Sequence, residues 1–251
     1  MTNPFDLSGR TAVVTGGGRG LGRGITRSML GAGADVVVLS RSQLDDELRA
    51  FAQGLGRHIS HMQVDLGDQQ SVAQAGAEVL DRHCIDILVN NAGTQDRHPA
   101  EDFPLDAWDS VLDVNLRSVV QLCQTFGRPM LERGDGKIVN LASLLSFQGG
   151  ITVAAYAASK GAVAQLTKAL CNEWAGRGVN VNALAPGYMA TDMNAALLAD
   201  PQRLEQLSAR IPAGRWGEPE DVGDVAVFLA SEAAKYVHGQ VLAVDGGWLA
   251  R

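Results

Sequence analysis

Thr11-Ala-Val-Val-Thr15 runs directly into Gly16-Gly-Gly-Arg-Gly-Leu-Gly22, and this stretch decides the fold. The first segment is short and β-branched without polar alternation, which is typical of a buried strand in a parallel sheet. A helical pattern then continues to about Gly31. In such a unit the glycines let the backbone approach a pyrophosphate, and the helix N-terminus offers unpaired amides. The unit therefore predicts a dinucleotide site, although a plain flexible turn would contain the same glycines.

Strands and helices alternate along the rest of the chain. Further strands are predicted at 34–41, 58–64, 85–93 (ending in a polar turn), 137–142, 179–185 and 240–244, and helices at 43–56, 68–83, 106–132, 154–178, 193–210 and 218–231. The sequence shows no repeat, linker or break in composition. It predicts a single α/β domain over residues 1–251, a Rossmann-type doubly wound parallel sheet of seven strands with helices on both faces. Residues 188–212 are expected to form a lid over the substrate, although a plain surface hairpin is the alternative.

The composition narrows the class of protein. Of the 251 residues, 46% are hydrophobic and 20% are charged, which are ordinary values for a globular domain. The net charge of −7 argues against a surface for nucleic acid or anionic lipid. No apolar run approaches the ~18–20 residues of a membrane span, and the N-terminus lacks the pattern of a signal peptide. We therefore expect a cytoplasmic protein without nucleic-acid or membrane partners.

The cysteines and histidines do not suggest a metal site. Cys84, Cys123 and Cys171 are widely spaced in apolar segments, and none stands in a CxxC or zinc-ligand pattern. The five histidines form no cluster along the sequence. The sequence predicts reduced, buried thiols and no bound metal.

The end of the second predicted strand bears on the choice of cofactor. In dinucleotide folds this strand ends near the adenosine ribose, where an acidic side chain selects NAD. Here the strand ends in Ser40-Arg41, without a carboxylate. Arg41, together with Arg19 of the glycine turn, would neutralise a 2′-phosphate, although either could be a solvated loop residue. The sequence therefore favours NADP(H), with NAD(H) still possible.

Tyr156 and Lys160 form the candidate catalytic pair. They are four residues apart on a predicted helix, so their side chains project from one face. A phenol with a pKa of about 10 is a poor acid–base catalyst at neutral pH, and we expect the neighbouring ammonium to lower that pKa. Ser143, in the preceding loop, is placed to hydrogen-bond the substrate oxygen. An exposed Tyr/Lys pair on an amphipathic helix is the alternative.

Asparagines supply further candidates. Asn115 lies inside a predicted helix, where asparagine has low propensity. It either faces solvent or is buried and holds a water molecule near Lys160. Asn90 and Asn91 either cap loop backbone or border the nicotinamide ribose.

Taken together, these motifs resemble the short-chain dehydrogenase/reductase family over the whole chain. Four motifs stand in family order: Thr15-Gly-x-x-x-Gly-x-Gly22, Asn90-Asn-Ala-Gly93, Ser143 with Tyr156-x-x-x-Lys160, and Pro186-Gly187 with Thr191. The resemblance implies that Asn115, Ser143, Tyr156 and Lys160 form a catalytic tetrad. It implies a cofactor site made by Gly16, Arg19, Gly20, Leu21, Gly22, Ser40, Arg41, Asp65, Leu66, Asn91, Ala92, Gly93, Tyr156, Lys160, Pro186, Gly187 and Thr191.

The second half is similar to one branch of that family, the 2-dehydro-3-deoxy-D-gluconate 5-dehydrogenases (also called 2-deoxy-D-gluconate 3-dehydrogenases) and gluconate 5-dehydrogenases. The likeness lies in Arg210-Ile-Pro-Ala-Gly-Arg-Trp-Gly217 and in the ending Ala243-Val-Asp-Gly-Gly-Trp-Leu-Ala-Arg251, among other segments. It implies hydride transfer between a nicotinamide cofactor and a secondary alcohol or ketone of a sugar acid. We expect Arg97, Ser143, Gln148 and Tyr188 to contact the substrate.

Other interpretations remain at this point. The family also reduces 3-oxoacyl thioesters and other small ketones, and a non-catalytic dinucleotide-binding regulator would share the fold. The resemblance and the apolar positions Val111, Leu122, Val163, Leu166 and Leu170 predict a homotetramer built on helices 106–132 and 154–178. Trp248, close to the C-terminus, is expected at a subunit interface and near the substrate pocket, although an unstructured tail is the alternative.

Overall fold

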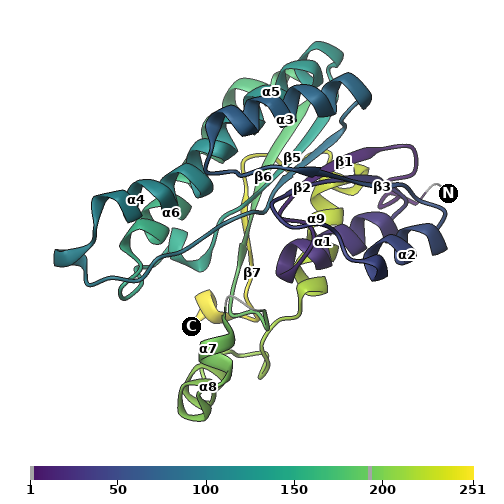
Figure 1. The fold of residues 1–251 in the computed structure, drawn as a ribbon. Helices are drawn as coiled ribbons and strands as arrows, with labels where there is room; N and C mark the ends of the chain where they lie inside the picture. The colour runs from purple at the N-terminus through teal and green to yellow at the C-terminus, as the bar shows by residue number, and fades with distance from the viewer. Residues whose placement is uncertain (1–2, 192–193) are drawn as a thin grey trace.

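The computed structural model describes residues 3–191 and 194–251, and one parallel sheet runs through the molecule (Figure 1). Its seven strands follow the order β3-β2-β1-β4-β5-β6-β7. The strands are β1 Thr11–Thr15, β2 Asp35–Ser40, β3 Ile59–Gln63, β4 Ile87–Asn90, β5 Gly136–Leu141, β6 Val179–Pro186 and β7 Val241–Val244. All six neighbouring pairs are parallel. The predicted doubly wound parallel sheet of seven strands is confirmed.

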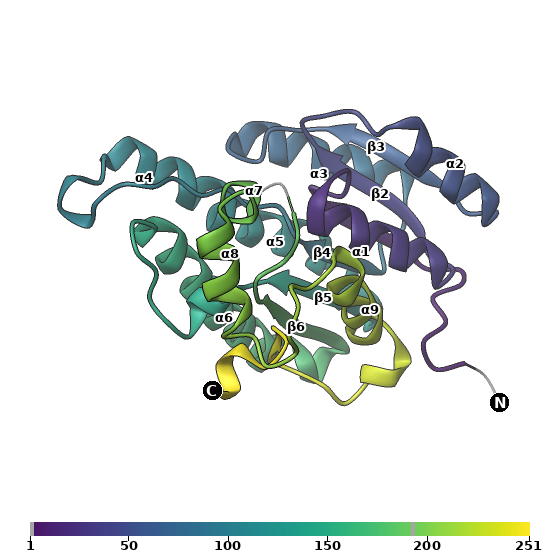
Figure 2. The ribbon, with the colours of Figure 1, turned by 90° about the horizontal axis from the view of Figure 1, so that it is seen from below.

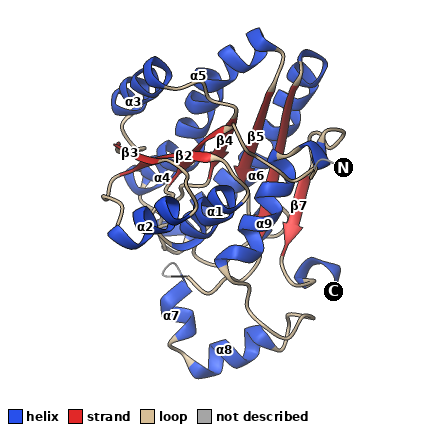
Figure 3. Ribbon diagram, turned by 90° about the vertical axis from the view of Figure 1, so that its right-hand side faces the viewer, coloured by secondary structure: helices blue, strands red, loops and turns tan. Residues whose placement is uncertain are grey.

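Helices cover both faces of this sheet (Figure 3). One face carries α1 Gly20–Gly31, α2 Asp46–Gly54 and α9 Pro219–Ala230, and the other carries α3 Gln69–Arg82, α5 Ser118–Arg133 and α6 Ala154–Trp174. Successive strand residues point to opposite faces. Val14 and Val38 therefore enter the first core, whereas Val13 and Val37 enter the second. Because both faces are covered, β1, β2 and β4 are apolar over most of their length instead of alternating, whereas the edge strand β3 is only partly buried and carries Ser60, His61 and Gln63.

The strand order places the functional loops at one edge. β1 lies between β2 and β4, where the order of the strands reverses. In open α/β sheets the crevice at the carboxyl ends beside this point is where ligands bind. The glycine turn follows β1, Asn91 follows β4 and Ser143 follows β5. Segments far apart in the sequence therefore converge on this edge.

Two predicted helices are divided in the structure. The expected helix 106–132 consists of α4 Leu105–Leu112, a π-helical turn Asp113–Arg117 and then α5. The expected helix 193–210 consists of two short helices, α7 Ala195–Leu198 and α8 Pro201–Ser208. A proline lacks the N–H that would continue a preceding helix, so α8 begins anew at Pro201 behind its cap Asp200.

The α7–α8 segment projects from the carboxyl edge of the sheet, and the C-terminal turn Trp248–Ala250 lies beside it (Figures 1 and 2). Arg251 Nη1 donates a hydrogen bond of 3.2 Å to the carbonyl of Ala209, just after α8. The C-terminal residues are thus attached to the body of the chain.

Two further observations concern the surface and the thiols. Among the described helices, none combines the length and apolar character needed to cross a lipid bilayer. All three cysteines are free thiols, but only Cys123 is buried, while Cys171 is half-buried and Cys84 is exposed. The prediction of buried thiols is therefore wrong for Cys84, which lies in the loop between α3 and β4.

Candidate active site

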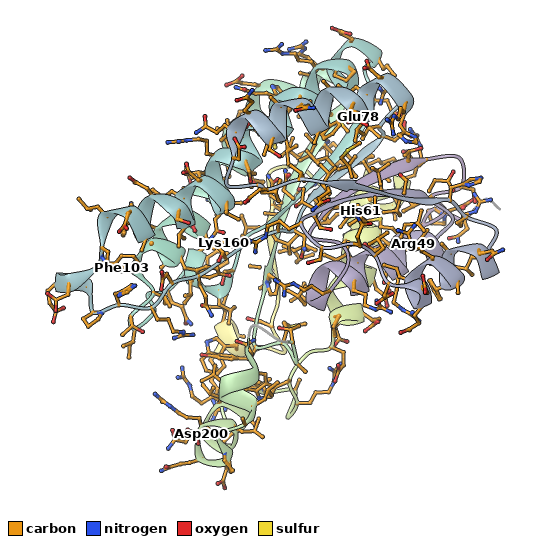
Figure 4. All side chains as sticks on the ribbon, viewed as in Figure 1. Arg49, His61, Glu78, Phe103, Lys160 and Asp200 are labelled. Atoms are coloured by element: carbon orange, nitrogen blue, oxygen red, sulfur yellow. The ribbon has the colours of Figure 1, made fainter. Side chains whose placement is uncertain are left out.

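A cleft of about 1680 Å³ runs along the carboxyl edge of the sheet. Every residue predicted to bind cofactor or substrate lines it, and so do three of the four predicted catalytic residues. The exception is Asn115, which is 0% exposed and lies behind the wall. In Figure 4, Lys160 lies near the centre of the molecule, and Asp200 marks the α7–α8 segment below it. The structure thus gathers the predicted site in one place.

The glycine turn after β1 leaves no room for a side chain at Gly17 or Gly22. A Cβ atom on Gly22 would lie 2.1 Å from the carbonyl oxygen of Gly16, and one on Gly16 would lie 3.2 Å from Asn91 Nδ2. Gly16 and Gly20 have positive φ angles of 65° and 50°, which glycine adopts without steric penalty. Asn91 closes the turn by donating a 2.9 Å hydrogen bond to the carbonyl of Thr15. This bare backbone, with the N-terminus of α1 beside it, fits a dinucleotide pyrophosphate.

The adenosine end of the cleft is cationic. Arg19 and Arg41 both line it with exposed side chains. Within the described part of the chain, neither arginine forms a salt bridge. Ser40 Oγ lies 3.1 Å from His61 Nε2, a neighbour that sequence reasoning missed because it depends on the pairing of β2 with β3. These groups suit the 2′-phosphate of NADP.

Asp65 and Leu66 complete this end of the cleft. Both residues line it directly after β3. The Asp65 carboxylate accepts a 2.9 Å hydrogen bond from the Gly67 amide, which fixes the turn. Both residues thus line the cleft in which the cofactor is expected.

Ser143, Tyr156 and Lys160 lie together in the middle of the cleft. Ser143 follows β5, and its side chain caps the 3₁₀ turn Leu144–Ser146 by accepting a backbone hydrogen bond of 3.2 Å. Tyr156 and Lys160 are one turn apart on α6, with Lys160 Nζ 5.7 Å from the centre of the tyrosine ring. Lys160 Nζ donates a 2.6 Å hydrogen bond to the carbonyl of Leu141. The ammonium is thereby tied to the end of β5.

Burial dominates the acid–base properties of this pair. Removal from water raises the pKa of the Tyr156 phenol above its ordinary value of 10.0, while a hydrogen bond with Ser143 acts in the opposite direction. Burial lowers the pKa of the Lys160 ammonium to about 8. The net shift of the Tyr156 pKa in this structure is therefore upward, opposite to the lowering expected from Lys160. Both groups lose water, and this disfavours the charged form of each.

Asn115 supports the cleft wall from behind. Its side chain exchanges two hydrogen bonds of 2.8 Å with the backbone of Thr94 and donates a third, of 3.0 Å, to Ser159 Oγ. A Cβ atom on Gly93 would lie 3.5 Å from Asn115 Oδ1 and 3.6 Å from Lys160 Nζ. Asn115 thus fixes the turn after β4 against the catalytic helix. The predicted role in holding a water molecule stays a prediction.

Pro186, Gly187 and Thr191 close the cleft across from the glycine turn. A Cβ atom on Gly187 would lie 2.7 Å from the Cα atom of Asp245, so this loop packs closely on the segment after β7. Thr191 Cβ is only 3.8 Å from the position that a Cβ atom on Gly20 would occupy. The loop therefore lies against the glycine turn, and its predicted contact with the cofactor stays a prediction.

The far end of the cleft holds aromatic and polar side chains. The ring of Tyr188 packs against Trp216 and Trp248, with centroids 5.3 Å and 4.7 Å apart. Trp248 Nε1 donates a 3.3 Å hydrogen bond to Gln148 Oε1. Arg97 lines the same cleft and is exposed. The predicted substrate residues therefore share one cavity with Ser143 and Tyr156.

Two residues at this end change the sequence-based interpretation. Trp248 lies at the cleft, as expected, but it is 5% exposed within its own chain, so no subunit interface is needed to bury it. Arg210 also lines the cleft, with its guanidinium 4.0 Å from the centre of the Trp248 ring. Arg210 was not predicted as a site residue, because only folding brings it to a tryptophan near the C-terminus.

In the part of the chain that the structure describes, no group of three or more potential ligands is arranged to hold a metal ion.

Comparisons with known proteins place this site among dehydrogenases. A family model described as enoyl-(acyl carrier protein) reductase matches residues 16–249. The 2-dehydro-3-deoxy-D-gluconate 5-dehydrogenase of Bacillus subtilis (strain 168) is 51% identical over 251 residues, which are 100% of this chain and 99% of that protein.

Two crystal structures are also similar. One, from Beutenbergia cavernae, is of a proposed NAD(P)-dependent gluconate 5-dehydrogenase with bound NADP at low occupancy. It has a TM-score of 0.96 and 53% identity, and the match covers 99% of this chain and 100% of that one. The other, from Agrobacterium tumefaciens, is of a proposed 2-deoxy-D-gluconate 3-dehydrogenase with bound NADP. Its TM-score is 0.94 and its identity 49%, and the match covers 100% of both chains.

Proposed function

The chain belongs to the short-chain dehydrogenase/reductase family, and from this premise we propose that it transfers a hydride between NADP(H) and a sugar acid. Its activity class, an NAD(P)-dependent oxidoreductase acting on CH–OH groups, follows from the family and from the named relatives. The proposed substrate is a secondary alcohol or ketone of the gluconate or deoxy-ketogluconate type. The proposal rests on one observation: Ser143, Tyr156 and Lys160 line the same cleft as several arginines that form no salt bridge among the described residues.

The cleft holds the cofactor along the carboxyl edge. The glycine turn would receive the pyrophosphate, and Arg19, Ser40 and Arg41 would receive the 2′-phosphate. Both similar crystal structures described above contain NADP, which supports the same cofactor here. When bound, a nicotinamide supplies the hydride chemistry, while the protein sets geometry and handles the proton.

The three central residues handle that proton. In ketone reduction the Tyr156 phenol donates its proton to the developing alkoxide, and Ser143 donates a hydrogen bond to the same oxygen. A raised pKa keeps Tyr156 protonated at neutral pH, as a proton donor must be. Lys160, tied to the end of β5, orients the helix that carries Tyr156 and offers donors to a ribose.

The substrate class rests on charge and on the relatives. A sugar acid carries a carboxylate and several hydroxyls, so its site needs a cation and polar donors. Arg97 and Gln148 both line the cleft, and Gln148 accepts a hydrogen bond from Trp248, which packs on Tyr188. A 3-oxoacyl thioester is the alternative substrate within the family, but its acyl chain calls for an apolar pocket. Apolar side chains such as Leu144, Leu207 and Trp248 also line this end, so it is the presence of arginines and Gln148 among them that favours the sugar acid.

A substrate panel tests the proposal. Purified protein would be assayed with NADP⁺ and NAD⁺ against gluconate and deoxy-sugar acids, and with NADPH and NADH against the matching keto acids and a 3-oxoacyl thioester. We expect the highest kcat/KM with a sugar acid and NADP(H). A higher kcat/KM for the thioester would overturn the assignment of substrate.

We also propose a cytoplasmic homotetramer and a lid over residues 188–212. Val111, Leu122 and Val163 are buried inside the single chain, so the premise that these three are surplus apolar positions is wrong. Leu166 and Leu170 on α6 are only partly buried and support a helix-to-helix contact between subunits. Light scattering at micromolar concentration should give four times the chain mass. A monomeric mass would end the proposal of a tetramer.

A further inference from the structure

The substrate end of the cleft contains a cation whose position is fixed by an aromatic ring. Six cationic side chains line the cleft: Arg19, Arg41, Arg97, Lys160, Arg203 and Arg210. The first two lie at the adenosine end, and Lys160 is 4% exposed and bonded to the backbone. Three arginines therefore remain within reach of an anionic substrate.

Of these three arginines, only Arg210 has its guanidinium seated on a ring in the described part of the chain, 4.0 Å from the centre of Trp248. Stacking holds the flat face of a guanidinium and leaves its N–H edge free for a carboxylate. No acidic side chain among the described residues pairs with Arg210, whereas the nearby Arg215 is already paired with Asp221. The Arg210 guanidinium is therefore held in place by Trp248 and remains available to bind an anion.

The indole ring of Trp248, which forms the platform under Arg210, is itself held by neighbouring residues. Trp248 packs on Tyr188 at 4.7 Å and donates a hydrogen bond to Gln148. Arg251 bonds the carbonyl of Ala209, next to Arg210. The C-terminal residues thus hold both the ring and the backbone that carries the cation.

This platform is also connected to the catalytic centre. Leu144, which follows Ser143 directly, shares one buried apolar cluster with Ile211 and Trp248. Gln148 bonds through its backbone amide to the carbonyl of Leu144 at 3.1 Å. Ser143, through its neighbour Leu144, and Arg210, through the Trp248 ring, are therefore anchored to the same packed cluster.

We propose that Arg210, stacked on Trp248, binds the carboxylate of the substrate and so sets which carbon meets Ser143 and Tyr156. Trp248 is then a positioning residue, and the C-terminal segment contributes to specificity. The inference rests on the proposed function, since it requires a substrate with a carboxylate. It assigns that carboxylate to Arg210 in place of Arg97, the residue expected from the sequence.

Matched variants and matched ligands test this assignment. D-gluconate and D-gluconamide, which differ in the charge of one end, would be used with the wild type, Arg210→Gln and Arg210→Lys. We expect Arg210→Gln to raise KM for gluconate at least tenfold and to leave KM for gluconamide within twofold. Arg210→Lys should recover little, because an ammonium lacks the planar fork. Calorimetric titration of gluconate into protein saturated with NADP⁺ should show the same loss of affinity.

Control variants separate local effects from general ones. Arg49→Gln removes an equally exposed charge on α2, outside the cleft, and should leave all constants unchanged (Figure 4). Trp248→Ala alone should weaken gluconate binding. Combined with Arg210→Gln, it should cause no further loss of gluconate affinity, because the ring is proposed to affect binding only by positioning the Arg210 guanidinium. Trp248→Phe, which keeps a ring, should retain most of the affinity.

The outcomes distinguish the two proposals. If the wild type oxidises gluconate and Arg210→Gln leaves its KM unchanged, the Arg210 assignment is wrong while the proposed function stands. A larger effect from Arg97→Gln or Arg203→Gln than from Arg210→Gln would also overturn it. A wild type that neither binds nor oxidises any sugar acid of the panel would overturn both.

Discussion

The two ends of the cleft are built in different ways. The cofactor end is made of backbone: Gly16 and Gly22 approach each other so closely that a Cβ atom on Gly22 would lie 2.1 Å from a carbonyl oxygen. The substrate end is made of side chains, with Tyr188 and Arg210 both packed against Trp248. The backbone turn would bind the pyrophosphate, which all dinucleotide cofactors share. The side chains at the substrate end can be substituted without disturbing the sheet. Evolution of a new substrate therefore needs changes at one end only.

Tyr156 stands between the two ends, and its replacement should have the largest effect. Tyr156→Phe removes the proton donor but keeps the ring, so kcat should fall about a thousandfold. Titration of NADP⁺ and of gluconate should give unchanged affinities, because neither end of the cleft is altered. If the variant retains more than about a tenth of kcat, which corresponds to a loss of roughly 1.4 kcal/mol, another group supplies the proton.

Gly22→Ala tests whether the cofactor end is as intolerant as its geometry indicates. The added Cβ atom would meet backbone, which cannot rotate away, so we expect loss of about 3 kcal/mol or more in unfolding free energy and loss of NADP⁺ binding. Gly31→Ala, in the same helix, is the matched control because its Cβ atom would meet nothing within 4 Å. That variant should be neutral or more stable by about 0.4–1 kcal/mol. Equal melting curves for the two variants would contradict the comparison.

Arg41→Ala tests the charge at the cofactor end. Removing one of two cations facing the 2′-phosphate should raise the Kd for NADP⁺ by roughly tenfold to a hundredfold, about 1.4–2.7 kcal/mol, and leave the Kd for NAD⁺ nearly unchanged. Fluorescence titration of both nucleotides measures this difference. If the wild type binds NAD⁺ as tightly as NADP⁺, the preference inferred from Ser40 and Arg41 is wrong.

The smallest expected effect concerns the pH dependence of stability at Lys160. Its pKa is about 8 in the folded chain, against 10.5 for an ordinary lysine. Between these two values the unfolded chain binds more protons than the folded chain, so the unfolding free energy increases with pH. Relative to Lys160→Met, the wild type should gain on the order of 1 kcal/mol from pH 7 to pH 9. Urea denaturation at both pH values measures the gain, and parallel curves for the two proteins would refute it.

Local patterns were enough to predict most of the fold and the central chemistry. The apolar, β-branched run Thr11–Thr15 favours burial on both faces, and the glycines that follow it favour a tight turn. Strand β1 and its turn could therefore be predicted from these residues alone. The spacing of Tyr156 and Lys160 places both on one helix face wherever the helix lies. The division of helix 106–132 was not predicted, because the π-helical turn contains Asn115, whose hydrogen bonds reach Thr94 on a distant loop. The division of helix 193–210 has a local signal, Pro201 after its cap Asp200, which the prediction overlooked.

By itself, then, the sequence determined the parallel sheet, the glycine turn and the pairing of Tyr156 with Lys160 on one helix face, since periodicity and spacing act within a few residues. Only the tertiary structure decided the raised pKa of Tyr156, the place of Asn115 behind the cleft wall, the burial of Trp248 and the seat of Arg210 upon it. Each of these depends on removal from water or on contact between residues far apart in the chain. Local sequence patterns do not encode either one.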